Sequence, residues 1–144
     1  ADTFASHAGI GIGLVMALRS TIRRAVNGEM TIPADLFPRP IPPTYMLGRL
    51  DTDFQTYPEQ EGIMRDAAQN MAYEASLELR KARELQNDVP KTGRACLLPA
   101  MPAMNYLSRI KEAEFNLWDP KLNTEQSRLW LLTMLGKSWL TGRI

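Results

Sequence analysis

The spacing of apolar and polar positions predicts helices along the chain, most clearly between Glu59 and Leu85. Apolar residues recur there every three or four positions, which places them on one face of a helix. This stripe consists of Met64, Ala68, Met71, Ala75, Leu79 and Ala82. Glu78 and Lys81 lie on another face at a spacing that allows an ion pair. The helix is expected to end before Asn87-Asp88-Val89-Pro90, because proline cannot continue it.

Three other segments show a helical pattern. Ala5 to about Ala25 begins as an apolar run, and Ala103 to about Phe115 is short and amphipathic. Glu125 to about Leu140 follows a potential N-cap at Thr124. The helical spacing of the second segment is carried by Met104, Leu107, Ile110 and Lys111, and the third contains Leu129, Trp130, Leu132, Leu135 and Trp139. No segment alternates with period two, so the predicted class is all-α.

Proline and glycine mark the connections between these helices. Asn27-Gly28 predicts a turn, and Ile32 to Pro43 contains five prolines that exclude a regular helix. We expect an extended surface loop there, although PRPIPP also has the composition of a polyproline ligand. Pro43 could open a short helix through Leu50. The remaining connections are a loop at Asp51–Pro58, an apolar, buried link at Ala95–Pro102 and a turn at Asp119-Pro120.

Length and composition limit the protein to one soluble-type domain, residues 1–144. Hydrophobic residues make up 44% of the chain and charged residues 23%, which is typical of a folded protein. The net charge of +1 gives no global signal for nucleic acid or membrane. The longest apolar run, Ala8 to Leu18, is shorter than the roughly 20 residues that span a bilayer. Because the chain begins without methionine, we expect a mature product or part of a longer protein.

Candidate chemistry is sparse. The single histidine, His7, and the single cysteine, Cys96, each stand without a motif, so a nucleophilic triad is not indicated. Cys96 has apolar neighbours and is expected to be a core thiol. The acidic pairs Asp51/Asp53 and Glu59/Glu61 lack the pattern of a magnesium site. We therefore predict no catalytic, cofactor-binding or metal-binding residues and no cofactor.

The first helix carries two further features with alternative interpretations. Glycines at positions 9, 11 and 13 could belong to a dinucleotide loop, but the third is misplaced and no strand precedes them. A buried helix crowded by its neighbours explains them better. Arg19, Arg23 and Arg24 could bind an anion, although a solvated or salt-bridging surface is the commoner arrangement. The arginines have no interleaved aromatic residue, so nucleic acid is not expected.

Ala5 to Leu36 resembles the second signature segment of the squalene and phytoene synthase family. Both have a small-residue helix that leads into Leu-Arg, here Leu18-Arg19, and then a glycine and a proline, here Gly28 and Pro33. In the family, two aspartates in this segment hold magnesium against the substrate's pyrophosphate. Their positions in this chain are Ser20 and Arg24. A guanidinium at a dication site would repel the metal, so the resemblance implies a pseudoenzyme.

The resemblance extends over nearly the whole chain. Glu61 to Pro90 is similar to the next helix of the family, and Leu97 to Leu107 and Ile110 to Pro120 are similar to its last helices. The sequence LSRIKEAEFNLWDPKL and the closing Ser138-Trp139 are especially close to the family's non-catalytic mitochondrial branch, which assembles respiratory complex I. The likeness covers only the C-terminal half of the family's isoprenoid-synthase-like helical domain.

This resemblance implies an all-α assembly or accessory component of a mitochondrial respiratory-chain or similar large complex, on the matrix side of the inner membrane. Its partners would be subunits of that complex and a chain or segment that supplies the missing N-terminal half, with peripheral membrane contact and no nucleic acid. Two alternatives remain open. The chain could be half of an active, magnesium-dependent prenyl-diphosphate synthase, or a non-catalytic isoprenoid- or lipid-binding protein that uses its arginines on a diphosphate.

Overall fold

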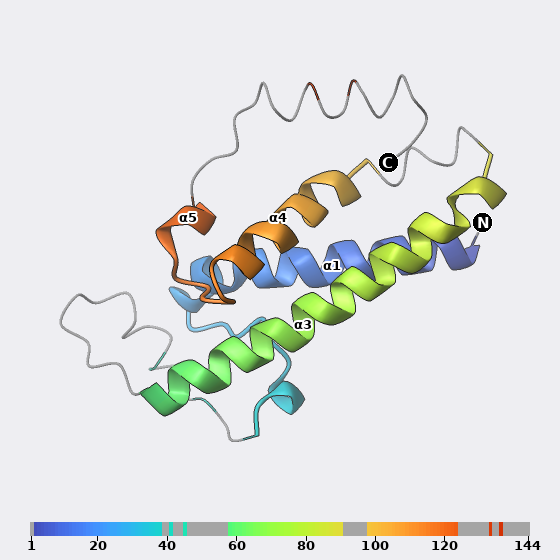
Figure 1. Cartoon of the computed structure of the whole chain (residues 1–144). Helices are drawn as coiled ribbons and strands as arrows, with labels where there is room; N and C mark the ends of the chain where they lie inside the picture. Colours follow the sequence, from blue (N-terminus) through green and yellow to red (C-terminus); the bar gives the residue numbers. More distant parts are fainter. Residues whose placement is uncertain are drawn as a thin grey trace.

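A computed structural model describes residues 2–38, 41, 45, 58–90, 98–123, 133 and 136. Its elements are α1 (Asp2–Ala25), the 3-10 turn η1 (Ala34–Leu36), α3 (Pro58–Leu85), the 3-10 turn η2 (Gln86–Asp88), α4 (Ala100–Glu112) and α5 (Pro120–Asn123). The long helices α1 and α3 pack against each other, and α4 packs on both (Figure 1). The described residues include no strand, and the all-α class is confirmed.

The core lies mainly between α1 and α3. Every residue of the predicted α3 stripe is buried, from Met64 to Ala82. The α1 residues buried in the core are Phe4, Ala8, Gly11, Val15, Leu18, Thr21 and Ala25. Alanines at the contact keep the two backbones close, and Met64 and Leu18 (both 1% exposed) fill the space that remains. The periodicity of the sequence thus predicts this interface correctly.

Of the three glycines in the first half of α1, only Gly11 is required by a close approach. A Cβ atom on Gly11 would lie 2.7 Å from Leu79 Cγ and 3.1 Å from the carbonyl oxygen of Ala75. Nothing lies within 4 Å of the same position on Gly9 or Gly13, and both residues are exposed. The prediction that neighbouring helices crowd the glycines is therefore wrong for two of the three, because spacing two directs successive residues to different faces.

α1 begins three residues before the predicted start at Ala5, with Asp2 in its first turn, where a carboxylate is favourable. It ends in a Schellman motif. Gly28 has φ +74°, and the Glu29 amide donates to the Arg24 carbonyl at 3.1 Å, while the Gly28 amide donates to the Ala25 carbonyl at 2.9 Å. The predicted turn at Asn27-Gly28 is confirmed.

α4 begins at Ala100, three residues earlier than predicted, so that the supposed link Ala95–Pro102 is partly helical. Pro102 is tolerated because the first-turn amides of a helix have no intrahelical acceptor. The buried face of α4 shares only one residue with the positions that carry the predicted helical spacing. It consists of Ala100, Ala103, Tyr106 and Ile110. Of the four positions that carry the predicted helical spacing, only Ile110 is fully buried, whereas Met104 and Leu107 are partly exposed and Lys111 is exposed.

The end of α4 has an unusual backbone. The Phe115 amide donates to the Ile110 carbonyl at 2.8 Å and the Glu114 amide to the Lys111 carbonyl at 3.0 Å, which again is a Schellman motif. Glu114 (φ 52°) and Phe115 (φ 58°) are both left-handed without being glycine. At the predicted turn Asp119-Pro120, the four-residue helix α5 begins, and Pro120 is its first residue.

Other connections agree with the predictions in part. The proline-rich segment contains the short turn η1 and is otherwise not helical where it is described, and Ile32 in it is buried at 2% exposure. Pro58 is the first residue of α3 and not the last residue of a loop. Two predicted segments lie outside the described residues. They are the last helix, of which only Thr133 and Gly136 are described, both helical, and the loop Asp51–Pro58 apart from Pro58. The other predicted features outside the described residues are Cys96, Asp51, Asp53, Thr124, Ser138-Trp139 and, except Tyr45, the helix Pro43–Leu50.

Candidate functional site on the outer face of the first helix

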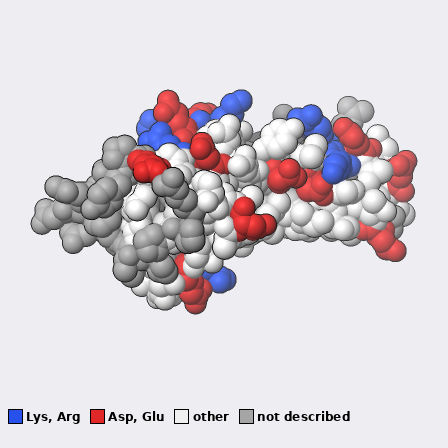
Figure 2. Space-filling view, turned by 90° about the horizontal axis from the view of Figure 1, so that it is seen from below, with Lys and Arg blue, Asp and Glu red and all other residues white. Residues whose placement is uncertain are grey.

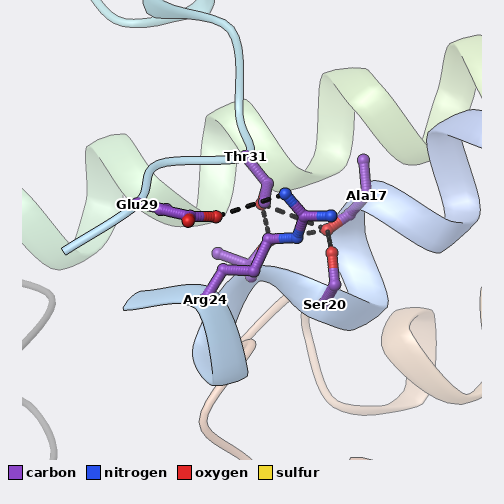
Figure 3. A network of polar contacts seen from close by, with 6 residues as sticks. Ala17, Ser20, Arg24, Glu29 and Thr31 are labelled. Carbon is purple, nitrogen blue, oxygen red and sulfur yellow. Dashed lines mark hydrogen bonds and ion pairs between the residues drawn. The ribbon is translucent and has the colours of Figure 1, made fainter. Parts of the chain in front are cut away.

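The two positions that the resemblance singles out, Ser20 and Arg24, lie one turn apart on α1. Ser20 is on the side of the helix opposite to the buried residue Leu18, and Arg24 is exposed. The Ser20 hydroxyl is half-buried and donates to the carbonyl oxygen of Ala17 in its own helix at 3.1 Å (Figure 3). This hydroxyl is therefore bound to the backbone and does not project from the helix as a carboxylate ligand would.

The Arg24 guanidinium forms a surface ion pair with Glu29. Its Nη1 lies 3.2 Å from Glu29 Oε2, and both side chains are 57% exposed (Figure 3). Such exposed pairs contribute only about 0–1 kcal/mol to stability. Arg19 and Arg23 are also exposed. Of the two interpretations of the arginine cluster, a salt-bridging surface therefore describes Arg24.

A cluster of hydroxyl groups lies beside the ion pair and fixes the segment that carries Glu29. Thr21 is fully buried, and its Oγ1 donates to the Ala17 carbonyl at 3.0 Å. Thr21 Oγ1 and Thr31 Oγ1 are 2.7 Å apart, and Thr31 Oγ1 also lies 3.1 Å from the Ala17 carbonyl. These bonds tie residues 29–32 back onto α1. Sequence analysis missed this cluster, because no local motif joins threonines ten positions apart.

The residues at this site do not fit the magnesium that the family uses. Magnesium needs hard carboxylate oxygens, and the nearest carboxylate, that of Glu29, is already paired with a guanidinium. Arg24 would also repel a dication. In the ranges that the structure describes, no group of three or more His, Cys, Asp and Glu side chains could hold a metal ion. No reaction step through a metal follows from this arrangement.

A second polar cluster joins α1 to α3. His7 Nδ1 lies 2.6 Å from Glu78 Oε2, and Lys81 Nζ donates to Glu78 Oε1 at 2.7 Å. The hydrogen bond from Lys81, and then that from His7, lowers the pKa of Glu78 below its usual value of 4.5. The predicted pair of Glu78 and Lys81 is confirmed. His7, expected to stand alone, instead bonds a residue 71 positions away.

The side of α1 that carries Ser20 is exposed and includes apolar residues. We call Gly9, Gly13, Met16 and Ser20, together with Ile10 at their edge, the outer face of α1. Ile10 and Met16 are 50% and 58% exposed. Exposed apolar surface of this kind is typical of binding sites for other proteins. No helix in the described part of the chain is long and apolar enough to cross a membrane.

Residues 1–130 match the squalene/phytoene synthase family, and the chain belongs to this family of all-α, isoprenoid-synthase-like proteins. The resemblance inferred from Leu18-Arg19, Gly28 and Pro33 is thereby confirmed. No solved structure matches the chain at a significant level.

The curated relatives are assembly factors. The chain is 27% identical over 139 residues to NADH dehydrogenase (ubiquinone) complex I, assembly factor 6 from Bos taurus, and 26% identical to the same protein from Homo sapiens. It is 27% identical over 131 residues to the homologue from Dictyostelium discoideum. These alignments cover 96%, 96% and 90% of the chain but only 39%, 39% and 34% of the relatives. The predicted likeness to the assembly-factor branch is confirmed.

Proposed function

We propose that this chain is catalytically inactive and acts by binding other proteins, as an assembly or accessory component of complex I or a similar large complex of the mitochondrial respiratory chain. The observation that carries the proposal is the chemistry of the outer face of α1. Where a prenyl-transferring relative would present two carboxylates, this helix presents a hydroxyl bonded to its own backbone and a guanidinium paired with Glu29. Neither group can bind magnesium against a diphosphate.

The names of the relatives support the same function, since each is described as an assembly factor of complex I. By the same reasoning we place the chain in the mitochondrion, on the matrix side of the inner membrane, with peripheral membrane contact only. Its partners would be subunits of the complex. The pseudoenzyme assignment, the absence of bound cofactors and the extent of the domain, residues 1–144, are part of this proposal.

We further propose that the outer face of α1 is covered by helices that supply the remainder of the family's domain, either from the same protein or from a partner chain. Met16 is 58% exposed on this face, and nothing lies within 4 Å of the Cβ position on Gly9 or Gly13, so that another helix could approach closely. The relatives also contain more than twice the length that this chain matches. A helical segment of the same family is the occupant with the matching shape and polarity.

The native size of the protein in mitochondria tests the binding function. Mild solubilisation, a native gel and mass spectrometry of co-migrating chains should place it in a large inner-membrane assembly. The double variant Ile10→Lys/Met16→Lys should shift it to a smaller species. Val26→Lys is the matched control, because Val26 is 59% exposed but lies outside the outer face. A wild-type protein that migrates as a small species would overturn the proposal.

The absence of catalysis is tested separately. The full-length protein, with any partner that co-purifies, would be incubated with farnesyl and geranylgeranyl diphosphate and magnesium, and the products would be measured by chromatography. We expect no condensation product above a protein-free blank. Turnover by the unmodified protein would show that other residues replace the missing carboxylates and would support the synthase alternative.

A further inference from the structure

A groove runs along the surface between α3 and α4, away from the outer face of α1. It consists of two hollows of about 250 and 240 Å³, and Ser76 and Leu107 border both of them. We call the continuous depression the α3–α4 groove. It exists because α4 turns Ala103 and Tyr106 toward the core, which leaves Met104 and Leu107 as its partly exposed wall. Met104 and Leu107, two of the residues that carry the predicted helical spacing, thus form part of a surface wall.

The groove is apolar in the middle and basic at both ends. Leu79 contributes to its floor, and the exposed ring of Tyr73 stands at its border. Arg80 and Arg83 lie at one end and Lys111 at the other, all three exposed, and the described lining residues include no aspartate or glutamate. On the face shown in Figure 2, basic and acidic side chains are interspersed with uncharged surface. An occupant of complementary charge would be apolar along one face and acidic on its flanks.

The dimensions of the groove suit a helix. Its lining on α3 extends from Gln69 to Arg83, which corresponds to about 20 Å, or roughly four helical turns. The wall formed by Met104 and Leu107 provides flexible apolar contacts of the kind that accept residues at i, i+3, i+4 and i+7 of an amphipathic helix.

The backbone beyond α4 gives the groove a fixed end. Phe115 lines the second hollow, and it is held there by two successive left-handed residues, Glu114 and Phe115. This conformation costs about 1–2 kcal/mol for each residue that is not glycine. Backbone strain of this size persists where the surrounding structure holds a side chain in a defined place. Phe115 and Lys111 thus line the same end of the groove.

We propose that the α3–α4 groove binds an acidic, amphipathic helix of a partner protein. The inference deepens the proposed function and rests on it, because it gives the chemistry of one partner. Residues 124–144 of the chain itself are a poor match by charge, since they contain three basic residues and one acidic residue. An anionic membrane is also disfavoured. Lipid-binding basic clusters contain about four to eight lysines or arginines, and here three basic residues surround a recessed apolar floor.

Binding of a synthetic peptide tests this proposal. The probe is a labelled helical peptide of about 16 residues with leucine at i, i+3, i+4 and i+7 and glutamate on both flanks, and its control has lysine in place of every glutamate. Fluorescence anisotropy with the intact protein should show binding of the acidic peptide only. Arg80→Glu/Arg83→Glu at one end and Lys111→Glu at the other should each weaken binding about tenfold or more. The lysine peptide should gain affinity for these variants.

Arg19→Glu/Arg23→Glu is the matched control, because it reverses two exposed charges outside the groove. Circular dichroism would verify that every variant is folded. Equal binding to the control and the groove variants, or no binding of the acidic peptide, would overturn the proposal. The proposal would also be overturned if the peptide did not bind but vesicles with 30% phosphatidylserine did, and if vesicle binding required Arg80, Arg83 and Lys111. If the unmodified protein did not bind the acidic peptide but still migrated in a large assembly on the native gel, the groove would be rejected as a binding site, whereas the proposed assembly function would stand.

Discussion

The two sides of α1 differ sharply although they belong to the same 24 residues. Its inner face packs on α3 so closely that Gly11 has no space for a Cβ atom, and Leu18 is 1% exposed. Its outer face leaves Ile10 and Met16 half or more exposed and gives Gly13 open space. The inner face is therefore constrained by the fold of this chain, whereas the residues of the outer face are free to serve a partner. Substitutions on the two faces should consequently affect different measurements.

The largest difference is expected between Leu18 and Met16. Leu18→Ala should reduce the free energy of unfolding by about 2–5 kcal/mol, because it removes a fully buried side chain and leaves a cavity. Met16→Ala, at a position that is 58% exposed, should change it by no more than about 0.5 kcal/mol. Urea denaturation followed by circular dichroism measures both. Similar losses for the two variants would mean that the outer face is also part of this chain's core.

The glycines provide a second pair with opposite signs. Gly11→Ala forces a contact with Leu79 and the Ala75 backbone, and such overpacking costs about 1–3 kcal/mol. The gain of about 1 kcal/mol in helix propensity offsets only part of this cost. Gly13→Ala gains the same propensity without a contact and should stabilise the protein. A stabilised Gly11→Ala variant would contradict the close packing of α1 and α3.

Adjacent hydroxyl residues give a smaller difference. Thr21→Val removes a buried hydroxyl that bonds Thr31 and Ala17, and we expect a loss of about 1 kcal/mol. Ser20→Ala removes only a bond to the helix's own carbonyl at a half-buried position and should change stability by less than about 0.5 kcal/mol. Thermal unfolding at neutral pH compares them. If Ser20→Ala cost as much as Thr21→Val, the outer face would carry structural constraints that its exposure does not suggest.

The smallest effect concerns the edge of the inner face, where Glu78 bonds Lys81 and His7. Because these bonds lower the pKa of Glu78 below 4.5, they favour its ionised form in the folded state. Their contribution to stability is present above pH 4.5 and is lost as the pH falls through the lower pKa of the folded protein. Glu78→Gln should therefore flatten the decline of the melting temperature below pH 4.5. Glu84→Gln, at an exposed position on the same helix, should leave this decline unchanged.

Sequence analysis was most successful where one helix buries one stripe. The range Glu59–Leu85 and all six residues of its stripe were predicted, because a long 3.6-residue period specifies both a helix and its buried face. It was less successful on α4, where apolar residues surround much of the helix. Both Tyr106 and Leu107 could face the core, and only the position of α1 selects Tyr106. The groove between α3 and α4 follows from that selection and was therefore not predicted.

The candidate site divides in the same way. The proposal that Ser20 and Arg24 replace the family's aspartates needs only the sequence, since it depends on residue identity and on alignment to a motif. The partners of these residues cannot be read from the sequence. Glu29 bonds Arg24 because a left-handed Gly28 reverses the chain, and Thr31 reaches Ala17 across the same turn. His7 bonds Glu78 only because α1 and α3 lie together.

The sequence by itself therefore determined the helical class and the longest helix, because both depend on local periodicity. The tertiary structure decided which glycine is sterically necessary, which face of α4 is buried and which polar groups are paired. These features depend on contacts between residues distant in the chain, and a contact of this kind leaves no periodic signal in either segment. The α3–α4 groove belongs to this second group, since its lining comes from two helices that only packing brings together.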